Sequence, residues 1–194
     1  MSRYPFISLI LSGGQSQRMG QDKATLQIGE QSLINRQVQL LESLNMPVWV
    51  SGYYPQYHYV EDDSDAKGPL AGIGSAMRTL ESQAKALLVI AVDMPLLTIS
   101  ALSEFLALVT EQEQCWFTDQ SRFPIWLPIN SQTLQHTKAC EQSGNFALKP
   151  WLSQLQARSV TCSHIQQLTN TNTPEQWQQA IAYLDGEERH ESQR

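Results

Sequence analysis

The sequence is poor in basic residues. Its 194 residues include 13 Lys and Arg against 19 Asp and Glu, so the formal net charge is −6. General affinity for nucleic acid requires a basic footprint, and the overall composition does not supply one. We therefore expect no nucleic-acid partner, although this balance is compatible with a small basic pocket for the phosphates of a metabolite.

Cysteines and long apolar runs are also scarce. Cys115, Cys140 and Cys162 lie far apart without any C-x-x-C spacing, which argues against a disulfide framework and against a zinc site. The apolar run 6–11 is too short for a secretory signal, and the run 86–92 is too short to cross a bilayer. We expect a cytoplasmic protein without a membrane partner.

What the chain does contain is an alternation of strand-like and helix-like segments. Hydrophobic residues make up 41% of the chain, as in globular proteins, and the length favours a single domain. Short apolar runs between turn residues predict strands at 6–12, 47–51, 86–92, 115–118, 125–128 and 159–164. Apolar residues at helical spacing predict helices at 33–45, 70–83, 100–111, 131–142 and 146–155.

The last helix has a well-defined start. Thr173 can cap it, Pro174 suits its first position, and Gln176 completes a capping-box pattern three residues after the cap. The polar segment 186–194 is expected to be a frayed tail after a single domain over 1–185.

Proline places a constraint on one of the predicted strands. Pro124 and Pro128 flank or end the run 125–128, which predicts an edge strand or an irregular one.

The helix over 33–45 has Ser32 as its expected N-cap.

This alternation predicts a fold class: α/β, with a Rossmann-like, mostly parallel sheet that has helices on both faces. Ligands of such sheets bind beyond the carboxyl ends of the strands. The segments to examine for function are therefore those that follow the strands: 12–23, 51–54, 61–72, 93–95 and 170–173.

The loop after the first strand carries the strongest signal. Residues 12–23 read S-G-G-Q-S-Q-R-M-G-Q-D-K. Glycines allow backbone N–H groups to approach an anion closely, and Arg18 and Lys23 add two cations. The loop has neither the P-loop spacing nor G-x-G-x-x-G. An ordinary glycine-rich turn is the alternative, but the two cations and Gly20 favour a triphosphate cradle.

With Leu11, this loop resembles the signature of the molybdenum cofactor guanylyltransferases, the MobA family. These enzymes are nucleotidyltransferases with a Rossmann-like sheet of the nucleotide-diphospho-sugar-transferase type. Further segments resemble the family in the same order along the chain, and the resemblance runs from Ile7 to about Leu184. These segments are E-D at 61–62, G-P-L-A-G at 68–72, D-M-P at 93–95 and N-T-N-T-P-E at 170–175.

The resemblance implies an activity: transfer of GMP from Mg-GTP to molybdenum-bound molybdopterin, which forms molybdopterin guanine dinucleotide and releases pyrophosphate. It implies Mg²⁺ as cofactor, and it suggests contact with other cofactor-biosynthesis proteins or with apo-molybdoenzymes. Two alternatives stay open. One is a cytidylyltransferase acting on molybdopterin or another small phosphate acceptor. The other is a non-catalytic nucleotide-binding protein, against which the presence of both Lys23 and Asp93 speaks.

The resemblance also implies which residues bind the nucleotide. Leu11, Ser12 and Gly13 would lie against base and ribose, and the loop from Gly14 onward would cradle the phosphates. Asp62 matches a position that contacts the nucleotide, and a charged, solvated loop is the alternative reading of its surroundings.

The catalytic roles are carried over in the same way. Lys23 would contact the α-phosphate and Arg18 the β- and γ-phosphates, while Asp93 would bind Mg²⁺. Asn170 and Asn172 would face molybdopterin. The alternatives are a solvated surface lysine at 23, a helix cap or turn at Asp93, and amides at Asn170 and Asn172 that bond their own backbone.

The chain departs from the family pattern in three places. After the second strand it has Ser51-Gly52 where the family often has Asn. It has Phe123 before Pro124 where His or Arg is usual, and Asn145-Phe146 where a basic residue is common. The last two departures lie in the half of the chain expected to bind molybdopterin.

Overall fold

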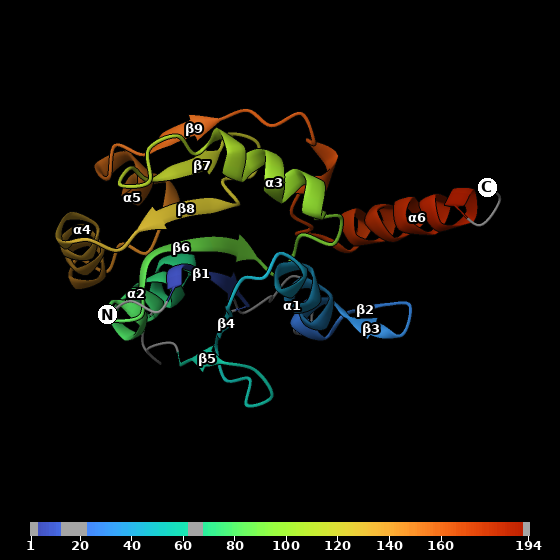
Figure 1. Cartoon of the computed structure of the whole chain (residues 1–194). Coiled ribbons are helices and arrows are strands. Elements are labelled where there is room, and N and C mark those ends of the chain that lie inside the picture. The colour runs from blue at the N-terminus through green and yellow to red at the C-terminus, as the bar shows by residue number, and fades with distance from the viewer. Residues whose placement is uncertain (1–3, 13–22, 62–67, 192–194) are drawn as a thin grey trace.

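The computed structural model describes residues 4–12, 23–61 and 68–191. A seven-stranded sheet forms the centre of the molecule, in the order β5-β4-β1-β6-β8-β7-β9 (Figure 1). Neighbouring strands are parallel except for β8, which is antiparallel to both β6 and β7. The strands are β1 Tyr4–Leu11, β4 Val48–Ser51, β5 Tyr59–Val60, β6 Ala84–Ala91, β7 Trp116–Thr118, β8 Ile125–Pro128 and β9 Arg158–Val160. The predicted mostly parallel α/β sheet is confirmed.

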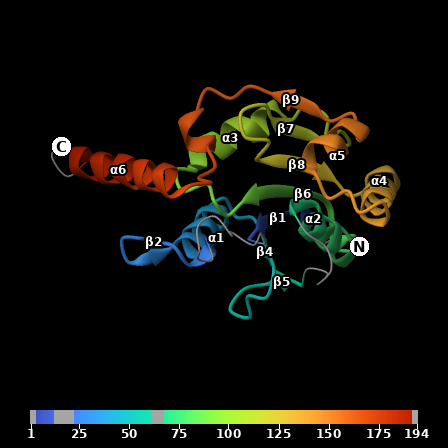
Figure 2. The same ribbon diagram turned by 180° about the vertical axis from the view of Figure 1, so that it is seen from behind.

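Helices cover both faces of this sheet. The helices α1 and α3 lie toward the viewer in Figure 1, whereas α2, α4 and α5 come forward when the molecule is turned in Figure 2. The bounds are α1 Leu33–Ser43, α2 Pro69–Leu80, α3 Ile99–Leu108, α4 Ser131–Gln142, α5 Leu148–Gln154 and α6 Pro174–Glu191. Smaller elements are the 3-10 turns η1 Lys23–Thr25 and η2 Gln166–Leu168 and the hairpin of β2 Gln27–Ile28 and β3 Gln31–Ser32.

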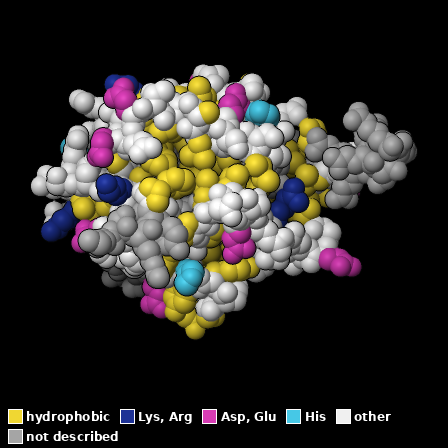
Figure 3. Space-filling model, viewed as in Figure 1, with side chains coloured by type: hydrophobic (Ala, Val, Ile, Leu, Met, Phe, Trp, Pro, Cys, Tyr) yellow, Lys and Arg dark blue, Asp and Glu magenta, His cyan; other side chains and the backbone are white. Residues whose placement is uncertain are grey.

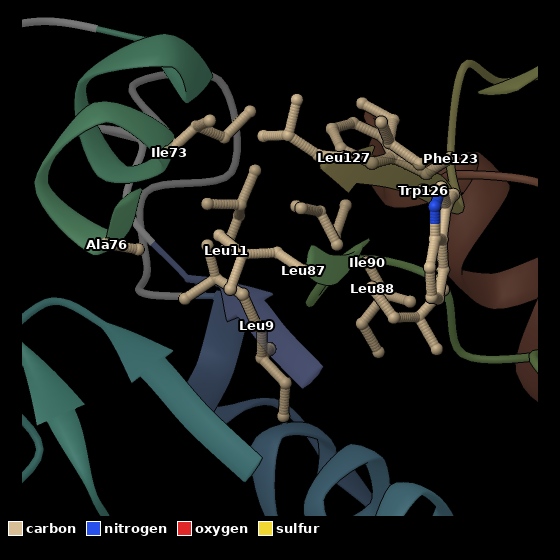
Figure 4. Packing of buried hydrophobic residues seen from close by; sticks show 14 of the residues in the cluster. Leu9, Leu11, Ile73, Ala76, Leu87, Leu88, Ile90, Phe123, Trp126 and Leu127 are labelled. Atoms are coloured by element: carbon tan, nitrogen blue, oxygen red, sulfur yellow. The ribbon is translucent and has the colours of Figure 1, made fainter. Parts of the chain in front are cut away.

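The core is centred on β6. Leu87, Leu88 and Ile90 are fully buried, because β1 and β8 flank the strand and helices cover it from both sides. Figure 4 shows Leu9 from β1, Ile73 from α2 and residues of β8 packed around them. A strand buried on both faces has no polar alternation, which is why the sequence is apolar from Ala86 to Val92, after the exposed Lys85. Each such leucine contributes about 1.5–3 kcal/mol through burial.

The expectation that 125–128 is an edge strand or an irregular one was wrong. The strand β8 lies between β6 and β7 and pairs with both. Pro124 precedes its first residue, and Pro128 is its last residue, opposite Ala86. The ladder then continues, since the Ile129 N–H donates to the Lys85 carbonyl at 2.7 Å. Prolines at the ends of a strand leave its interior hydrogen bonds intact.

Both predicted helix caps form. The Ser32 hydroxyl accepts from the Asn35 N–H at the start of α1. At α6, the Thr173 hydroxyl accepts from the Gln176 N–H at 3.3 Å. The Gln176 side chain accepts instead from the Asn172 N–H at 2.7 Å, one residue before the cap, so it fixes the backbone of the preceding segment.

The helix α6 is longer than the sequence suggested. It runs to Glu191, into the segment 186–194 for which a frayed tail was expected. Both ribbon views show it extending away from the sheet (Figure 1, Figure 2). Within the described part of the chain, none of the helices combines the length and apolar character needed to cross a membrane.

Candidate active site

The strand directions bring several chain segments to one edge of the sheet. Because β1, β4 and β6 are parallel, Ser12, Gly52 and Asp93 emerge at the same side. The strand β7 runs in the same direction as β6, since both are antiparallel to β8. The turn 119–124, which joins β7 to β8, therefore lies at this edge as well.

Lys23 is held at this edge by three oxygen atoms. Its Nζ lies 2.7 Å from Oδ2 of Asp93, and it donates to the Thr171 carbonyl at 2.8 Å and to Oδ1 of Asn172 at 3.2 Å. The side chains of Lys23 and Asp93 are each only 13% exposed. An ammonium group has three donors, and all three are engaged here. Lys23 is thus not a solvated surface lysine.

Asp93 joins the end of β6 to the segment 170–172. Its Oδ1 accepts from Nδ2 of Asn170 at 2.6 Å, and its carbonyl accepts from the Thr171 N–H at 2.8 Å. Asp93 does not cap the following helix, because Thr98 caps α3 by accepting from the Ala101 N–H. Its carboxylate instead lies at the sheet edge, with one oxygen paired with Lys23 and the other with Asn170.

Two cavities open beside this ion pair. The first, of about 260 Å³, is lined by Leu11, Ser12, Lys23, Pro69, Ala91, Val92, Asp93, Phe123, Asn170 and Asn172. The second, of about 440 Å³, shares Pro69, Phe123, Asn170 and Asn172 with the first and continues along Gln120, Ser121, Arg122, Leu148, Leu168 and Thr169. The ion pair thus borders one cavity, and a larger one adjoins it.

The Ser51-Gly52 departure has a packing role. The Ser12 hydroxyl donates to the Ser51 carbonyl, which ties the end of β1 to the end of β4. Gly52 has a φ of 105°, and a Cβ there would lie 3.3 Å from the Ser12 hydroxyl and 3.1 Å from the Tyr54 ring. Glycine at this position allows the two strand ends to approach each other closely.

Charged side chains are scattered on the face of the molecule that Figure 3 shows. On the face shown in Figure 3, Lys and Arg side chains lie singly rather than in one basic patch. Two of the described arginines have carboxylate partners: Arg78 pairs with Glu141 and Arg158 with Glu111.

Comparison with known proteins identifies the family. Residues 8–169 match the MobA-like NTP transferase domain. The chain belongs to this family. The MobA-like chain is 33% identical over 183 residues to the molybdenum cofactor guanylyltransferase of Xanthomonas euvesicatoria pv. vesicatoria (strain 85-10), with 91% of this chain and 95% of that protein covered. It is 30% identical over 194 residues to the protein of the same name from Shewanella loihica, with 91% and 97% covered.

Solved structures agree on the fold. The MobA-like chain superposes on molybdopterin-guanine dinucleotide biosynthesis protein A from Archaeoglobus fulgidus with a TM-score of 0.73, 16% identity and coverage of 92% and 98%. A cytidylyltransferase for 2-C-methyl-D-erythritol 4-phosphate from Thermus thermophilus gives a TM-score of 0.66 at 14% identity, with 94% and 98% covered. These structures show the Rossmann-like fold. The family match and the curated relatives show that the MobA-like chain is a nucleotidyltransferase.

The structure brings together all of the predicted site residues that it describes. Leu11, Ser12, Lys23, Asp93, Asn170 and Asn172 all line the first cavity. Gly13, Gly14, Arg18 and Asp62 lie outside the described residues.

Two features of the MobA-like site were not predicted. Thr171 stands between the two named asparagines, and its carbonyl accepts from Lys23. The turn 120–123 was not among the segments expected at the ligand edge. The turn lies at this edge because β7 runs in the same direction as β6, and the direction of a short strand cannot be read from its sequence.

The oxygen atoms at this edge suit a hard cation. They include the Asp93 carboxylate and the amide oxygens of Asn170 and Asn172. Within the described ranges, Oδ1 of Asn170 is buried and has no hydrogen-bond partner. Those ranges contain no group of three or more His, Cys, Asp or Glu placed to hold a metal. Mg²⁺ needs only one or two carboxylates when phosphate oxygens and water complete its shell, so these residues fit it.

Proposed function

We propose that this MobA-like protein transfers GMP from Mg-GTP to molybdenum-bound molybdopterin, forming molybdopterin guanine dinucleotide and releasing pyrophosphate. The observation that carries the proposal is the meeting of Lys23 and Asp93 at the carboxyl edge, enclosed by the segment 170–172. The names of the relatives from Xanthomonas and Shewanella support the choice of nucleotide and acceptor.

The reaction is a displacement at the α-phosphorus of GTP. An oxygen of the acceptor's terminal phosphate forms a bond to that phosphorus, and the bond from the α-phosphorus to the oxygen that bridges it to the β-phosphate breaks. The electron pair leaves with pyrophosphate. Because the acceptor phosphate is already ionised near pH 7, no general base is needed. The enzyme's task is to align two polyanions and to offset their repulsion.

The chain's own residues divide this task. The ammonium of Lys23 would donate to oxygens of the α-phosphate and stabilise the charge that develops there. Arg18 and the loop from Gly14 would bind the β- and γ-phosphates. Leu11, Ser12, Gly13 and Asp62 would hold base and ribose, with Leu11 and Ser12 lining the first cavity.

Asp93 is the residue that would hold Mg²⁺. When bound, Mg²⁺ supplies positive charge to the triphosphate. Asn170 keeps the Asp93 carboxylate in place through the bond from its Nδ2. Asn170 and Asn172 also line both cavities, so they stand where nucleotide and acceptor would meet.

A pyrophosphate-release assay with molybdenum-loaded molybdopterin tests the proposal. Transfer with GTP and Mg²⁺, absent when the acceptor is left out, is the expected result. Thermal unfolding provides a second measurement, since a ligand that binds the folded state raises the melting temperature. A non-catalytic nucleotide-binding protein would show that shift without pyrophosphate release, and a cytidylyltransferase would use CTP in preference to GTP.

A further inference from the structure

One cation lines the second cavity among the residues that the structure describes. Its volume is about 440 Å³, and it adjoins the cavity of Lys23 and Asp93 through Asn170 and Asn172. Arg122 lies in the turn between β7 and β8. Among the described residues that line this cavity, it is the one with a basic side chain. Phe123, the next residue, lines both cavities.

The Arg122 side chain has no carboxylate partner within the described ranges. The ion pairs found there are Lys23–Asp93, Arg78–Glu141, Arg158–Glu111 and His164–Glu104. Asp119, three residues away, accepts instead from the Thr161 hydroxyl. An exposed arginine that borders a cavity and is not neutralised by a carboxylate is suited to bind an anion.

The turn holds Arg122 in a fixed position. The Arg122 N–H donates to the Thr118 carbonyl at 2.9 Å. The buried hydroxyl of Thr118 and the hydroxyl of Ser121 each donate to the Phe123 carbonyl at 2.6 Å. Arg122 has a φ of 68°, a conformation that residues with a side chain rarely adopt. These bonds maintain that backbone conformation, and the exposed Arg122 side chain extends from it at the lining of the cavity.

We infer that Arg122 binds the acceptor at its end remote from the reacting phosphate, and this inference rests on the proposed function. The acceptor phosphate must reach the cavity of Lys23 and Asp93, so the rest of the molecule extends into the adjoining cavity. That remote end carries dithiolene sulfurs bound to molybdenum, which are negatively charged. Arg122 is therefore a specificity-determining residue for the acceptor.

The test compares Arg122→Gln with the wild-type protein. Loss of a hydrogen bond to a charged group weakens binding by about tenfold or more. Arg122→Gln therefore raises the KM for molybdenum-loaded molybdopterin by about tenfold. The dissociation constant of this acceptor, measured without GTP, rises equally. The KM for GTP and kcat change by less than about threefold, because Arg122 touches neither the nucleotide nor the reacting phosphate.

Two variants serve as controls. Lys138→Gln removes one exposed positive charge on α4, away from both cavities, and behaves as wild type. Arg122→Lys keeps the charge and restores part of the affinity. Circular dichroism and the melting temperature confirm that each variant is folded.

The outcomes separate the two proposals. If wild-type protein transfers GMP but Arg122→Gln binds the acceptor as tightly as Lys138→Gln does, the inference is wrong and the proposed function stands. An increase in the KM for GTP as large as that for the acceptor would also overturn the inference, since Arg122 would then bind the triphosphate. Absence of transfer by the wild-type protein would reject the proposed function itself.

Discussion

Lys23 and Asp93 are 70 residues apart in the chain, yet the ammonium nitrogen of one lies 2.7 Å from a carboxylate oxygen of the other. The segment 170–172 binds both of them, so three distant parts of the chain converge on one ion pair. Each charge is neutralised by the other in this structure. Removal of either residue therefore leaves a mostly buried charge without its partner. The proposed role of Lys23 at the α-phosphate and that of Asp93 at Mg²⁺ thus depend on each other.

Replacement of Asp93 tests the metal assignment. Asp93→Asn keeps the size and an acceptor oxygen for Lys23, so the fold should remain intact, but it removes the charge that would hold Mg²⁺. We expect pyrophosphate release to fall by roughly a hundredfold or more. Asp185→Asn, an exposed position on α6, is the matched control and should retain activity. A folded Asp93→Asn protein that is fully active at ordinary Mg²⁺ would refute the assignment.

Replacement of Lys23 tests the role of its charge at the α-phosphate. Lys23→Ala is expected to lower kcat by on the order of a hundredfold, as the loss of a preorganised charge in a transition state does. Lys138→Ala removes an exposed lysine from α4 and should have no comparable effect. The measurement is steady-state pyrophosphate release at saturating GTP. Similar rates for the two variants would mean that Lys23 acts only in the structure of the site.

Glu104 should make stability depend on pH in the acid range. The Ser163 backbone N–H, the His164 side chain and the Ser163 hydroxyl donate to its carboxylate and lower its pKa from 4.5 to about 2. A carboxyl whose pKa is lowered on folding contributes fully above its unfolded pKa, and the contribution is lost as pH falls through the folded value.

The variant Glu104→Gln measures this contribution. We expect a lower melting temperature than wild type at pH 7 and a difference that shrinks as the pH falls from 4.5 toward about 2. Glu113→Gln, at an exposed position in the turn before β7, is the control. A difference that is constant across this range would show that the carboxylate charge is not what stabilises the contact between α3 and the chain after β9.

The cysteines should be unreactive in the folded protein. Cys115, Cys140 and Cys162 are buried. Burial raises the pKa of the Cys115 thiol to about 12. Burial is also the main cause that raises the pKa of Cys162, to about 11, and the pKa of Cys140. Because the thiolate is the reactive form, iodoacetamide at pH 8 should label none of them until denaturant is added. Mass spectrometry of the alkylated protein gives the number of modified thiols; rapid labelling of the native chain would contradict the burial.

Much of the fold could be predicted from the sequence, because the strands β1 and β6 are long apolar runs with clear ends. The position of β8 could not. Pro124 and Pro128 mark the two ends of the strand but do not indicate which strands it lies between. The strands β5 and β3 have two residues each, too few for any periodicity. The length of α6 was underestimated because its last turns lack an apolar stripe.

The site was predictable where it follows parallel strands. Lys23, Asp93 and the segment 170–172 belong to recognisable motifs, and the fold brings them together at the expected edge. Arg122 belongs to no motif, and it comes to the same edge only because β8 is antiparallel to its neighbours. Which turns face the ligand is thus decided by strand order, a property of the whole sheet.

The central claim is guanylyl transfer, and the choice of nucleotide tests it most directly. The guanine edge presents a carbonyl acceptor and N–H donors, which the backbone at 11–13 would match without a particular side chain. A base with the wrong donors would leave buried groups unpaired. With molybdenum-loaded molybdopterin as acceptor, we predict that kcat/KM for GTP exceeds that for CTP by at least about tenfold, or about 1.4 kcal/mol. Equal use of the two triphosphates, or a preference for CTP, would contradict the account and favour a cytidylyltransferase.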